Sequence, residues 1–369
     1  MEFRQCPVEN MAISASFWKR KRVFLTGHTG FKGSWLTFWL STLGAEIVGY
    51  SLPVPPSQPN HFALLNLPVV SMTGDVRDVS RLTASLNTHQ PDIVFHLAAQ
   101  ALVRRSYSEP IKTFETNVIG TANLLEACRK TESVKAVVTI TSDKCYENQE
   151  WIWGYRENDP LGGYDPYSAS KGCAEIVAAS YRNAFFPLER YGASHQTLLA
   201  TCRAGNVIGG GDWGEDRFIP DVIKATIRHE RVLLRSPQAI RPWQHVLEPL
   251  YGYLLLGQRL LEGKTEFAEA WNFGPFDDNV LSVQEMIDMA QREWHVIDYE
   301  IASEAEQPHE AARLTLDCSK ARSRLEWKPR WNIATALSKT LRWYRSFYEQ
   351  GIIMTMQDLQ DYVSEICVS

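Results

Sequence analysis

The 369-residue sequence has no excess of basic residues. Its 38 Lys and Arg are outnumbered by 43 Asp and Glu, and the formal net charge is −5. Proteins that bind nucleic acids usually present a clustered basic face. We therefore expect small-molecule partners and no nucleic acid.

A cysteine framework is also missing. The seven cysteines are odd in number, scattered along the chain and never spaced as Cys-x-x-Cys. This pattern favours free thiols in a reducing compartment over disulfide bonds. The chain has no Cys/His spacing and no pair of histidines four residues apart that would be typical of a metal site, so no metal is expected.

Long hydrophobic runs are absent as well. No uncharged apolar stretch approaches the roughly 18 to 20 residues that a membrane span requires. The first twenty residues mix Glu2, Arg4 and Glu9 with short apolar pieces, which is unlike a signal peptide. We expect a soluble, cytoplasmic protein without a membrane span. Residues 1–16 are expected to be a leader, either flexible or upstream of a second start at Met11.

What the chain does contain is an alternation of short apolar strands with helical patterns. Apolar residues make up 44% of the sequence, enough for a large core. Such alternation predicts an α/β fold with a Rossmann-type, doubly wound parallel sheet. The predicted strands are 21–25, 46–50, 69–72, 92–97, 136–141 and 196–203, and the predicted helices are 35–43, 79–87, 116–129 and 167–183.

A glycine loop joins the first predicted strand to the first predicted helix. Residues 26–33 read Thr-Gly-His-Thr-Gly-Phe-Lys-Gly, with glycines spaced as G-x-x-G-x-x-G. Glycine at such a turn allows positive φ and lets the backbone approach a pyrophosphate at the helix N-terminus. The loop therefore predicts a dinucleotide site.

The end of the second predicted strand departs from the usual dinucleotide pattern. An acid for the adenosine ribose is expected there, but the chain has Tyr-Ser-Leu-Pro from Tyr50 to Pro53. No Arg replaces the acid to hold a 2′-phosphate, so NAD is preferred to NADP. After the third strand, Asp75 could reach the adenine edge or could simply cap a helix.

The chain changes character after about residue 205. Gly209 to Gly211, Pro-rich turns and isolated helices replace the clean alternation. We predict an NAD-binding Rossmann domain at 17–205. A smaller C-terminal, substrate-binding lobe is predicted at 206–369, interleaved with elements that return to the sheet.

Tyr167 and Lys171 form a candidate catalytic pair. Four residues apart on a predicted helix, they share one face and could reach the same bound molecule. A neighbouring positive charge favours tyrosinate, so Lys171 is expected to lower the Tyr167 pKa and let Tyr167 take a proton from an alcohol. Alone, the spacing is common by chance; with the glycine loop it favours catalysis.

A polar turn follows the predicted strand 136–141. Thr141-Ser142-Asp143-Lys144 lies at the carboxyl end of that strand, where open α/β sheets bind their ligands. Ser142 offers a hydroxyl, and Asp143 and Lys144 offer an acid and a base. An ordinary polar turn is the alternative explanation.

Several strings together resemble a known family. TGHTGFKG, HLAAQ at 96–100, Tyr167 with Lys171, and RAGN at 203–206 resemble the extended short-chain dehydrogenases that act on nucleotide sugars, over about residues 17–345. TSDKCYEN, YSASKGCAE, GGGDWGEDRFIPD, RPWQHV and LDCSKARSRLEWKPRW resemble, more narrowly, the CDP-glucose branch of the nucleotide-sugar 4,6-dehydratases. In that branch, the resemblance implies, Lys144 replaces the glutamate base of other 4,6-dehydratases; this would require Lys144 to lose its proton beside Lys171 or in a partly dry cleft.

The resemblance also implies the site residues. The expected catalytic residues are Ser142, Asp143, Lys144, Tyr167 and Lys171. The expected substrate-binding residues are Asn206, Arg217 and Arg241. The residues expected at NAD are Gly27, His28, Gly30, Phe31, Lys32, Gly33, Ser51, Asp75, Val76, Leu97, Ala98, Ala99, Gln100, Asn117, Thr141, Tyr167 and Lys171.

The expected reaction is that of a lyase. CDP-D-glucose would become CDP-4-keto-6-deoxy-D-glucose and water by NAD-mediated oxidation at C4, elimination across C5 and C6, and hydride return to C6. The resemblance places this reaction in dideoxysugar biosynthesis for surface polysaccharide (O-antigen) and implies a homodimer built on the helices 116–129 and 167–183. The alternatives are a nucleotide-sugar 4-epimerase, which has no C6 leaving group for Asp143 to protonate, and a catalytically silent NAD-binding regulator.

Overall fold

The structure is a computed structural model and describes residues 13, 15–276, 280–302 and 313–368. Most of the expected leader, residues 1–16, therefore lies outside the described residues. The first described helix, α1 (Ala15–Trp18), buries Trp18 in the main core.

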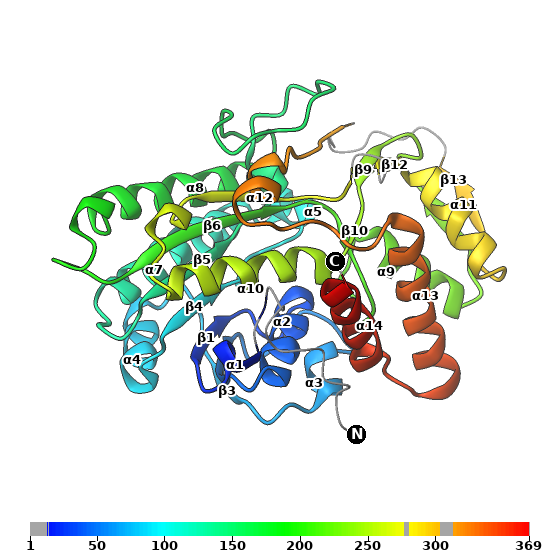
Figure 1. Ribbon diagram of the computed structural model, residues 1–369. Helices are drawn as coiled ribbons and strands as arrows, with labels where there is room; N and C mark the ends of the chain where they lie inside the picture. Colours follow the sequence, from blue (N-terminus) through cyan, green and yellow to red (C-terminus); the bar gives the residue numbers. More distant parts are fainter. Residues whose placement is uncertain (1–12, 14, 277–279, 303–312, 369) are drawn as a thin grey trace.

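A seven-stranded parallel sheet forms the centre of the molecule (Figure 1). Its order is β11-β6-β5-β4-β1-β2-β3, and the strand order reverses between β1 and β4, the position at which such sheets bind ligands. The predicted Rossmann-type sheet and its six strands are confirmed. The strands are β1 (Arg22–Thr26), β2 (Glu46–Ser51), β3 (Val70–Thr73), β4 (Ile93–His96), β5 (Ala136–Ile140), β6 (Leu198–Ala204) and β11 (Ala270–Phe273).

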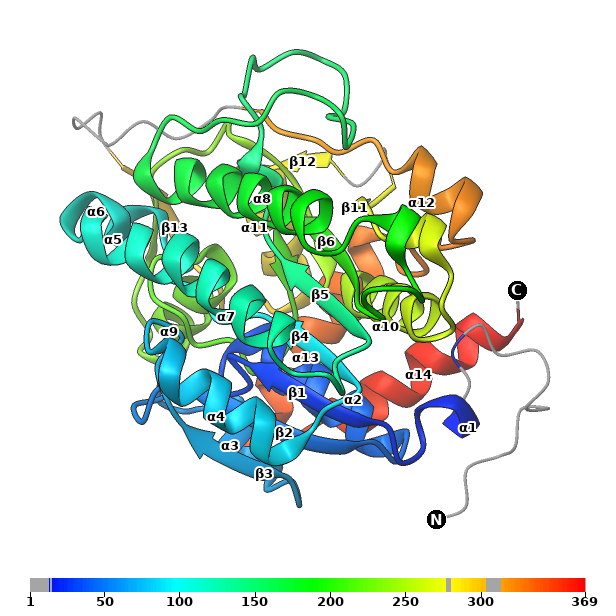
Figure 2. The same ribbon diagram turned by 90° about the vertical axis from the view of Figure 1, so that its left-hand side faces the viewer.

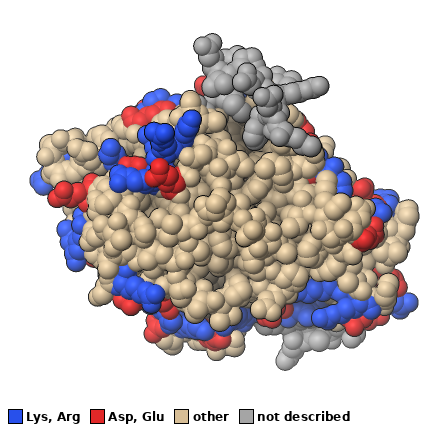
Figure 3. Space-filling view, turned by 90° about the horizontal axis from the view of Figure 1, so that it is seen from below, with Lys and Arg blue, Asp and Glu red and all other residues tan. Residues whose placement is uncertain are grey.

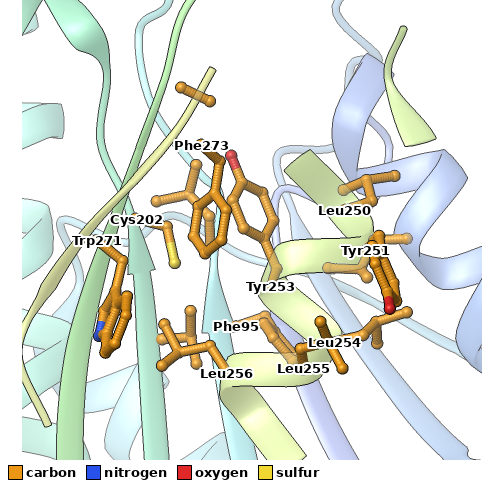
Figure 4. Close-up of a cluster of buried hydrophobic side chains, with 14 of the residues drawn as sticks. Phe95, Cys202, Leu250, Tyr251, Tyr253, Leu254, Leu255, Leu256, Trp271 and Phe273 are labelled. Carbon is orange, nitrogen blue, oxygen red and sulfur yellow. The ribbon is translucent and has the colours of Figure 1, made fainter. Parts of the chain in front are cut away.

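Helices cover both faces of this sheet. On one face α4 (Val79–His89), α7 (Gly120–Arg129) and α8 (Pro166–Ala184) lie side by side (Figure 2). On the other face lie α2 (Phe31–Thr42) and α10 (Leu247–Leu261). Figure 4 shows leucines of α10 packed with side chains of β4 and β6 in the larger core. The sheet is thus buried on both faces, which explains why every residue of β4, β5 and β6 is buried.

Local signals fix the ends of these helices. Gly44, with φ 79°, follows α2, and Asp165 accepts a hydrogen bond from Ser168 N at the start of α8, where Pro166 occupies the first turn. One boundary differs from the prediction. The helix expected at 116–129 begins as a π-helical turn, η2 (Glu115–Ile119), directly after α6 (Pro110–Phe114), because its backbone continues the preceding helix instead of starting at a cap.

A second lobe lies beyond the carboxyl ends of the strands, at the right of Figure 1. It has a core of its own, in which α9 (Phe218–Ile227), α11 (Val283–Glu293) and α13 (Ile333–Gln350) pack together. Both β11 and α10 come from the C-terminal half of the chain and join the central sheet layer. The remaining elements are α3 (His61–Leu65), α5 (Val103–Ser108), β7 (Val207–Ile208), β8 (Val232–Leu234), β9 (Ile240–Pro242), β10 (Gln244–His245), β12 (Val280–Ser282), β13 (Tyr299–Ile301), α12 (Ser319–Arg324) and α14 (Thr355–Val368).

The C-terminal helix α14 ties the second lobe to the glycine-loop helix. The buried His61 ring hydrogen-bonds Ser34 of α2 at 2.8 Å and Thr355 of α14 at 2.8 Å. Trp343 of α13 donates to the same Thr355 hydroxyl at 3.0 Å. This buried chain fixes α2, and with it the glycine loop, relative to the second lobe.

Charges of both signs are interspersed on the face in Figure 3, mostly near its rim, and no basic patch forms there. Among the described residues no helix combines the length and apolar character that crossing a bilayer demands. In the same part of the chain no three His, Cys, Asp or Glu side chains gather as metal ligands.

Candidate active site

The glycine loop lies between β1 and α2 and packs against the turn after β4. A Cβ added at Gly27 (φ 77°) would lie 2.8 Å from Ala98 N, and one at Gly33 would lie 2.1 Å from Gly27 O. Only glycine fits at either position. Gly30 caps α2 without a side-chain hydrogen bond. The loop therefore presents backbone at a helix N-terminus, which fits a pyrophosphate.

The side chains of His28 and Ser51 contact each other instead of projecting from the loop. His28 Nδ1 lies 2.8 Å from Ser51 Oγ, and Nε2 lies 2.7 Å from Ser71 Oγ. The ring also fills the space beside Gly49, where a Cβ would clash at 2.3 Å. Burial lowers the His28 pKa to about 4, so the ring is neutral. His28 and Ser51, both expected at NAD, are thus hydrogen-bonded inside the protein, where they support the glycine loop.

Asp75 is engaged by its neighbour Arg77. The guanidinium donates to the carboxylate at 2.7 Å and also pairs with Glu115 at 3.2 Å. The residue that caps α4 is Asp78, whose side chain accepts from Arg81 N, so the alternative of an Asp75 helix cap is wrong. Val76 is buried against Gly120, where an added Cβ would lie 2.7 Å from Val76 Cγ2.

Asn117 links the turn after β4 to the Tyr-Lys helix. Its side chain accepts from Gln100 N at 2.8 Å and donates to Gln100 O and to Ser170 Oγ. Asn117 is buried and lies in the π-helical turn η2. The structure thus shows it joining Gln100 to α8.

Ser142, Asp143 and Lys144 form a tight turn at the carboxyl end of β5. Ser142 Oγ donates to Asp143 Oδ1 at 3.0 Å and accepts from Lys144 N at 3.2 Å, capping the short 3-10 helix η3 (Asp143–Cys145). Asp143 is 4% exposed, and burial raises the pKa of its carboxyl against the opposing charge of Lys144. The turn therefore holds a carboxyl suited to donate a proton.

Tyr167 and Lys171 lie on one face of α8, both buried, with Lys171 Nζ 3.4 Å from Ile140 O at the end of β5. Burial raises the Tyr167 pKa to about 12, while a hydrogen bond with Ser142 lowers it in part. Burial also lowers the Lys171 pKa to about 8. The Tyr167 pKa is therefore raised on balance and not lowered as expected, because burial outweighs the opposing effects of the Ser142 hydrogen bond and the Arg217 charge.

The predicted residues from distant parts of the chain converge on this turn. The charges of Lys32 and Arg241 both act on Asp143, and the charge of Arg217 acts on Tyr167. Burial lowers the pKa of Lys32 to about 8, and Asp143 opposes this shift. The glycine loop, the Asp143 turn and the Tyr167 helix therefore share one site.

The three predicted substrate-binding residues border the same region from the second lobe. Arg217 forms an ion pair with the nearly buried Asp212 at 2.9 Å. Arg241 of β9 is buried and donates to Ile240 O. Asn206 follows β6, and its carbonyl accepts from Gln244 N at 3.0 Å.

Sequence reasoning missed Glu175 and Arg203 as a functional pair. They form an ion pair of 2.8 Å in which both side chains are 3% exposed, directly behind the Asp143 turn. Glu175 continues the spacing of Tyr167 and Lys171 by a further four residues, so helical periodicity could have revealed it. Asp212 was also missed; its place in the loop before Arg217 gave no periodic signal.

The same fold occurs in two solved structures. The UDP-glucose 4-epimerase of Thermotoga maritima, solved with UDP-glucose, superposes with a TM-score of 0.75 at 22% identity, over 89% of this chain and 99% of the other. The dTDP-glucose 4,6-dehydratase of Streptomyces venezuelae, solved with NAD, superposes with a TM-score of 0.74 at 24% identity, over 88% and 97%.

Sequence comparison places the chain more narrowly. It belongs to the GDP-mannose 4,6 dehydratase family, whose profile matches residues 24–340. It is 49% identical to the CDP-glucose 4,6-dehydratase of Salmonella typhimurium over 356 residues, which cover 95% of this chain and 99% of that protein. The family expected from the sequence motifs is confirmed.

Proposed function

We propose that this protein is a hydro-lyase that converts CDP-D-glucose to CDP-4-keto-6-deoxy-D-glucose and water. The identity of 49% with a CDP-glucose 4,6-dehydratase along nearly the whole chain supports the substrate. The observation that carries the reaction is the buried Asp143 carboxyl, with its raised pKa, in the same site as Tyr167. A carboxyl beside Tyr167 can protonate a hydroxyl group of the substrate, which then leaves as water.

NAD is the proposed cofactor, and the glycine loop fits it because Gly27 and Gly33 leave room only for backbone. When bound, NAD would accept the hydride from C4 and return it to C6. Backbone of the loop and of the Leu97 to Gln100 turn would hold the dinucleotide. Asn117 would hold that turn in place, and His28 and Ser51 would support the loop.

Tyr167 is the proposed base of the first step. It takes the proton of the sugar 4-hydroxyl while the C4 hydrogen leaves as hydride. The Ser142 hydrogen bond and the positive charge of Arg217 both oppose the rise that burial gives the Tyr167 pKa. Lys171 supplies a further positive charge on the same helix face.

Asp143 and Lys144 are the proposed acid and base of the elimination. The ketone at C4 acidifies C5, and Lys144 removes the C5 proton. Asp143 donates its proton to the C6 hydroxyl, the C6–O bond breaks and water leaves. Burial raises the pKa of the Asp143 carboxyl, the direction that favours proton donation.

Arg217, Arg241 and Asn206 are the proposed contacts to the nucleotide pyrophosphate. Guanidinium groups can bind phosphate oxygens in a bidentate manner. Asp212 would orient Arg217 through the ion pair already described.

The proposed enzyme works in the cytoplasm as a homodimer. Large apolar side chains stand exposed on the two predicted interface helices, 116–129 and 167–183, namely Ile119 (54%) and Ile176 (57%). Light scattering of the purified protein tests this: a monomer at micromolar concentration would contradict it.

A nucleotide-sugar panel tests the function. Purified protein with NAD is offered CDP-, dTDP-, GDP- and UDP-sugars, and the 4-keto-6-deoxy product is read by its absorbance in alkali. We expect product with CDP-glucose. Conversion of UDP-glucose to UDP-galactose alone would indicate the 4-epimerase instead, and no turnover of any sugar would indicate a silent NAD-binding regulator.

A further inference from the structure

Glu175 lies at the centre of a buried polar cluster behind the proposed catalytic turn. One carboxylate oxygen accepts from Thr141 Oγ1 at 2.5 Å, and the other accepts from Thr201 Oγ1 at 2.7 Å and Arg203 Nη2 at 2.8 Å. Both oxygens are therefore bonded inside the protein. Burial raises the pKa of Glu175, but Arg203 and the hydroxyl donors outweigh it and leave the pKa below its usual value.

This cluster holds both ends of the turn that carries Asp143. Thr141 precedes the turn. Tyr146 follows it, and Arg203 donates to the Tyr146 hydroxyl at 2.7 Å and covers its ring at 4.9 Å from the centroid. Glu175 bonds Thr141 directly and Tyr146 through Arg203. Because Glu175 belongs to α8, these bonds fix the turn relative to Tyr167.

Glu175 also faces Lys171, one helical turn away. The other titratable groups that act on or are acted on by Lys171 are Cys145 of η3, His96 of β4 and Lys32 of α2. Burial raises the pKa of the Cys145 thiol well above its usual value and lowers that of His96 to about 3, so both are neutral, and Lys32 carries no negative charge. Among these described groups, Glu175 is the one that favours the ammonium form of Lys171 by a negative charge.

We propose that Glu175 is a positioning residue of the dehydratase reaction: its buried carboxylate fixes the Ser142 to Lys144 turn against α8 and keeps Lys171 positively charged. The proposal rests on the proposed function. Glu175 touches neither sugar nor cofactor in this account and acts through Thr141, Arg203 and Lys171.

The test separates the two parts of this role. Glu175→Gln keeps the length of the side chain and removes its charge. Glu175→Asp keeps the charge and shortens the side chain by one methylene group. The first step is followed in single turnovers as transient NADH absorbance with CDP-glucose, over a range of pH. This step involves Tyr167 and Lys171 but not the proton donated by Asp143.

For Glu175→Gln we expect the alkaline limb of the single-turnover rate to move by about one unit to lower pH, since loss of a nearby opposite charge lowers the Lys171 pKa. For Glu175→Asp we expect the limb to stay in place while the rate of product formation falls by about tenfold or more, since the turn shifts. The control Thr201→Val removes one hydroxyl from the same carboxylate and should leave the limb unmoved.

If the alkaline limb of the single-turnover rate stays at its wild-type pH in folded Glu175→Gln, the proposal is overturned. A shift of the same size in Thr201→Val would overturn it as well. If Glu175→Gln does not fold because Arg203 is left buried without a partner, the double variant Glu175→Gln/Arg203→Met removes both charges and should show the same shift. Failure of the proposed function is distinct: the wild-type protein would then form no product at all from CDP-glucose.

Discussion

The carboxylate of Asp143 lies against Gly205, which follows β6: a Cβ added at Gly205 would lie 3.0 Å from Asp143 Oδ2 and 3.0 Å from Pro242 Cγ. The proposed acid thus has room because the residue directly after the neighbouring strand β6 has no side chain. This contact joins the Rossmann sheet to β9 of the second lobe at the point where the sugar is expected to react.

Gly205→Ala should therefore impair the reaction without unfolding the protein. Gly205 is not among the glycines with positive φ, so alanine is tolerated by the backbone, but its methyl group displaces the Asp143 carboxyl. We expect kcat to fall by about 10- to 100-fold, as for other small displacements of reacting groups. Steady-state kinetics and a thermal melt check this; wild-type kcat in the variant would show that the carboxyl is not held where we infer.

Substitutions at Lys144 and Asp143 should separate the two halves of the elimination. Lys144→Ala removes the base, so both exchange of the C5 hydrogen with deuterated water and product formation should fall by about 10²- to 10⁴-fold. Asp143→Asn removes the acid, so C5 exchange should continue while product formation falls. Both reactions are read by NMR. Full-rate water loss in Lys144→Ala would remove that residue from its proposed role.

Loss of Asp212 should weaken substrate binding more than catalysis. Asp212→Asn breaks the ion pair that orients Arg217, so the KM for CDP-glucose should rise by about tenfold, roughly 1.4 kcal/mol of binding free energy, with little change in kcat. The matched control is Asp221→Asn on α9, whose carboxylate pairs loosely with Lys224 at 3.9 Å. An unchanged KM in Asp212→Asn would place Arg217 outside the substrate site.

Acid should destabilise the fold through His61. Burial lowers its pKa to about 3, so the unfolded chain, with a usual histidine pKa of 6.5, binds the proton more tightly. The stability is present above pH 6.5 and is lost as the pH falls toward 3. Between pH 7 and pH 5 the protonation of His61 should remove about 2 kcal/mol of the free energy of unfolding.

Urea unfolding at both pH values checks the His61 prediction. His61→Gln should lower stability at pH 7 but should lose less of it on acidification than the wild-type protein. The control His295→Gln changes an exposed histidine and should leave the pH dependence unaltered. An identical pH dependence in the wild-type and His61→Gln proteins would contradict the prediction.

The sequence predicted the central sheet well because its signals are local. Apolar runs such as Ile93 to His96 and caps such as Gly44 and Asp165 act within a few residues. The second lobe was harder to predict, because short pairs such as β9 with β12 depend on residues 40 apart and carry little periodicity of their own. The return of β11 to β6 is likewise a long-range pairing that no nearby residue signals.

The site shows the same division. Motif spacing found Tyr167, Lys171 and the Asp143 turn, and the structure brings them together. Their electrostatics could not be read from spacing, because burial sets the sign of the Tyr167 shift and burial is a property of the whole fold. The side-chain partners of His28 and Asp75 could not be predicted for a related reason. The partner of His28 is Ser71 on the neighbouring strand β3, and the partner of Asp75 is Arg77, whose pairing depends on the conformation of the turn.

CDP-glucose with deuterium at C4 tests whether the groups of this site act together on one sugar. If Tyr167, Asp143, Lys144 and the nicotinamide converge on one hexose, the hydrogen that leaves C4 stays within the site, and the 4-keto-6-deoxy product carries deuterium at C6. NMR or mass spectrometry reads the label. A product without deuterium at C6 would contradict the account.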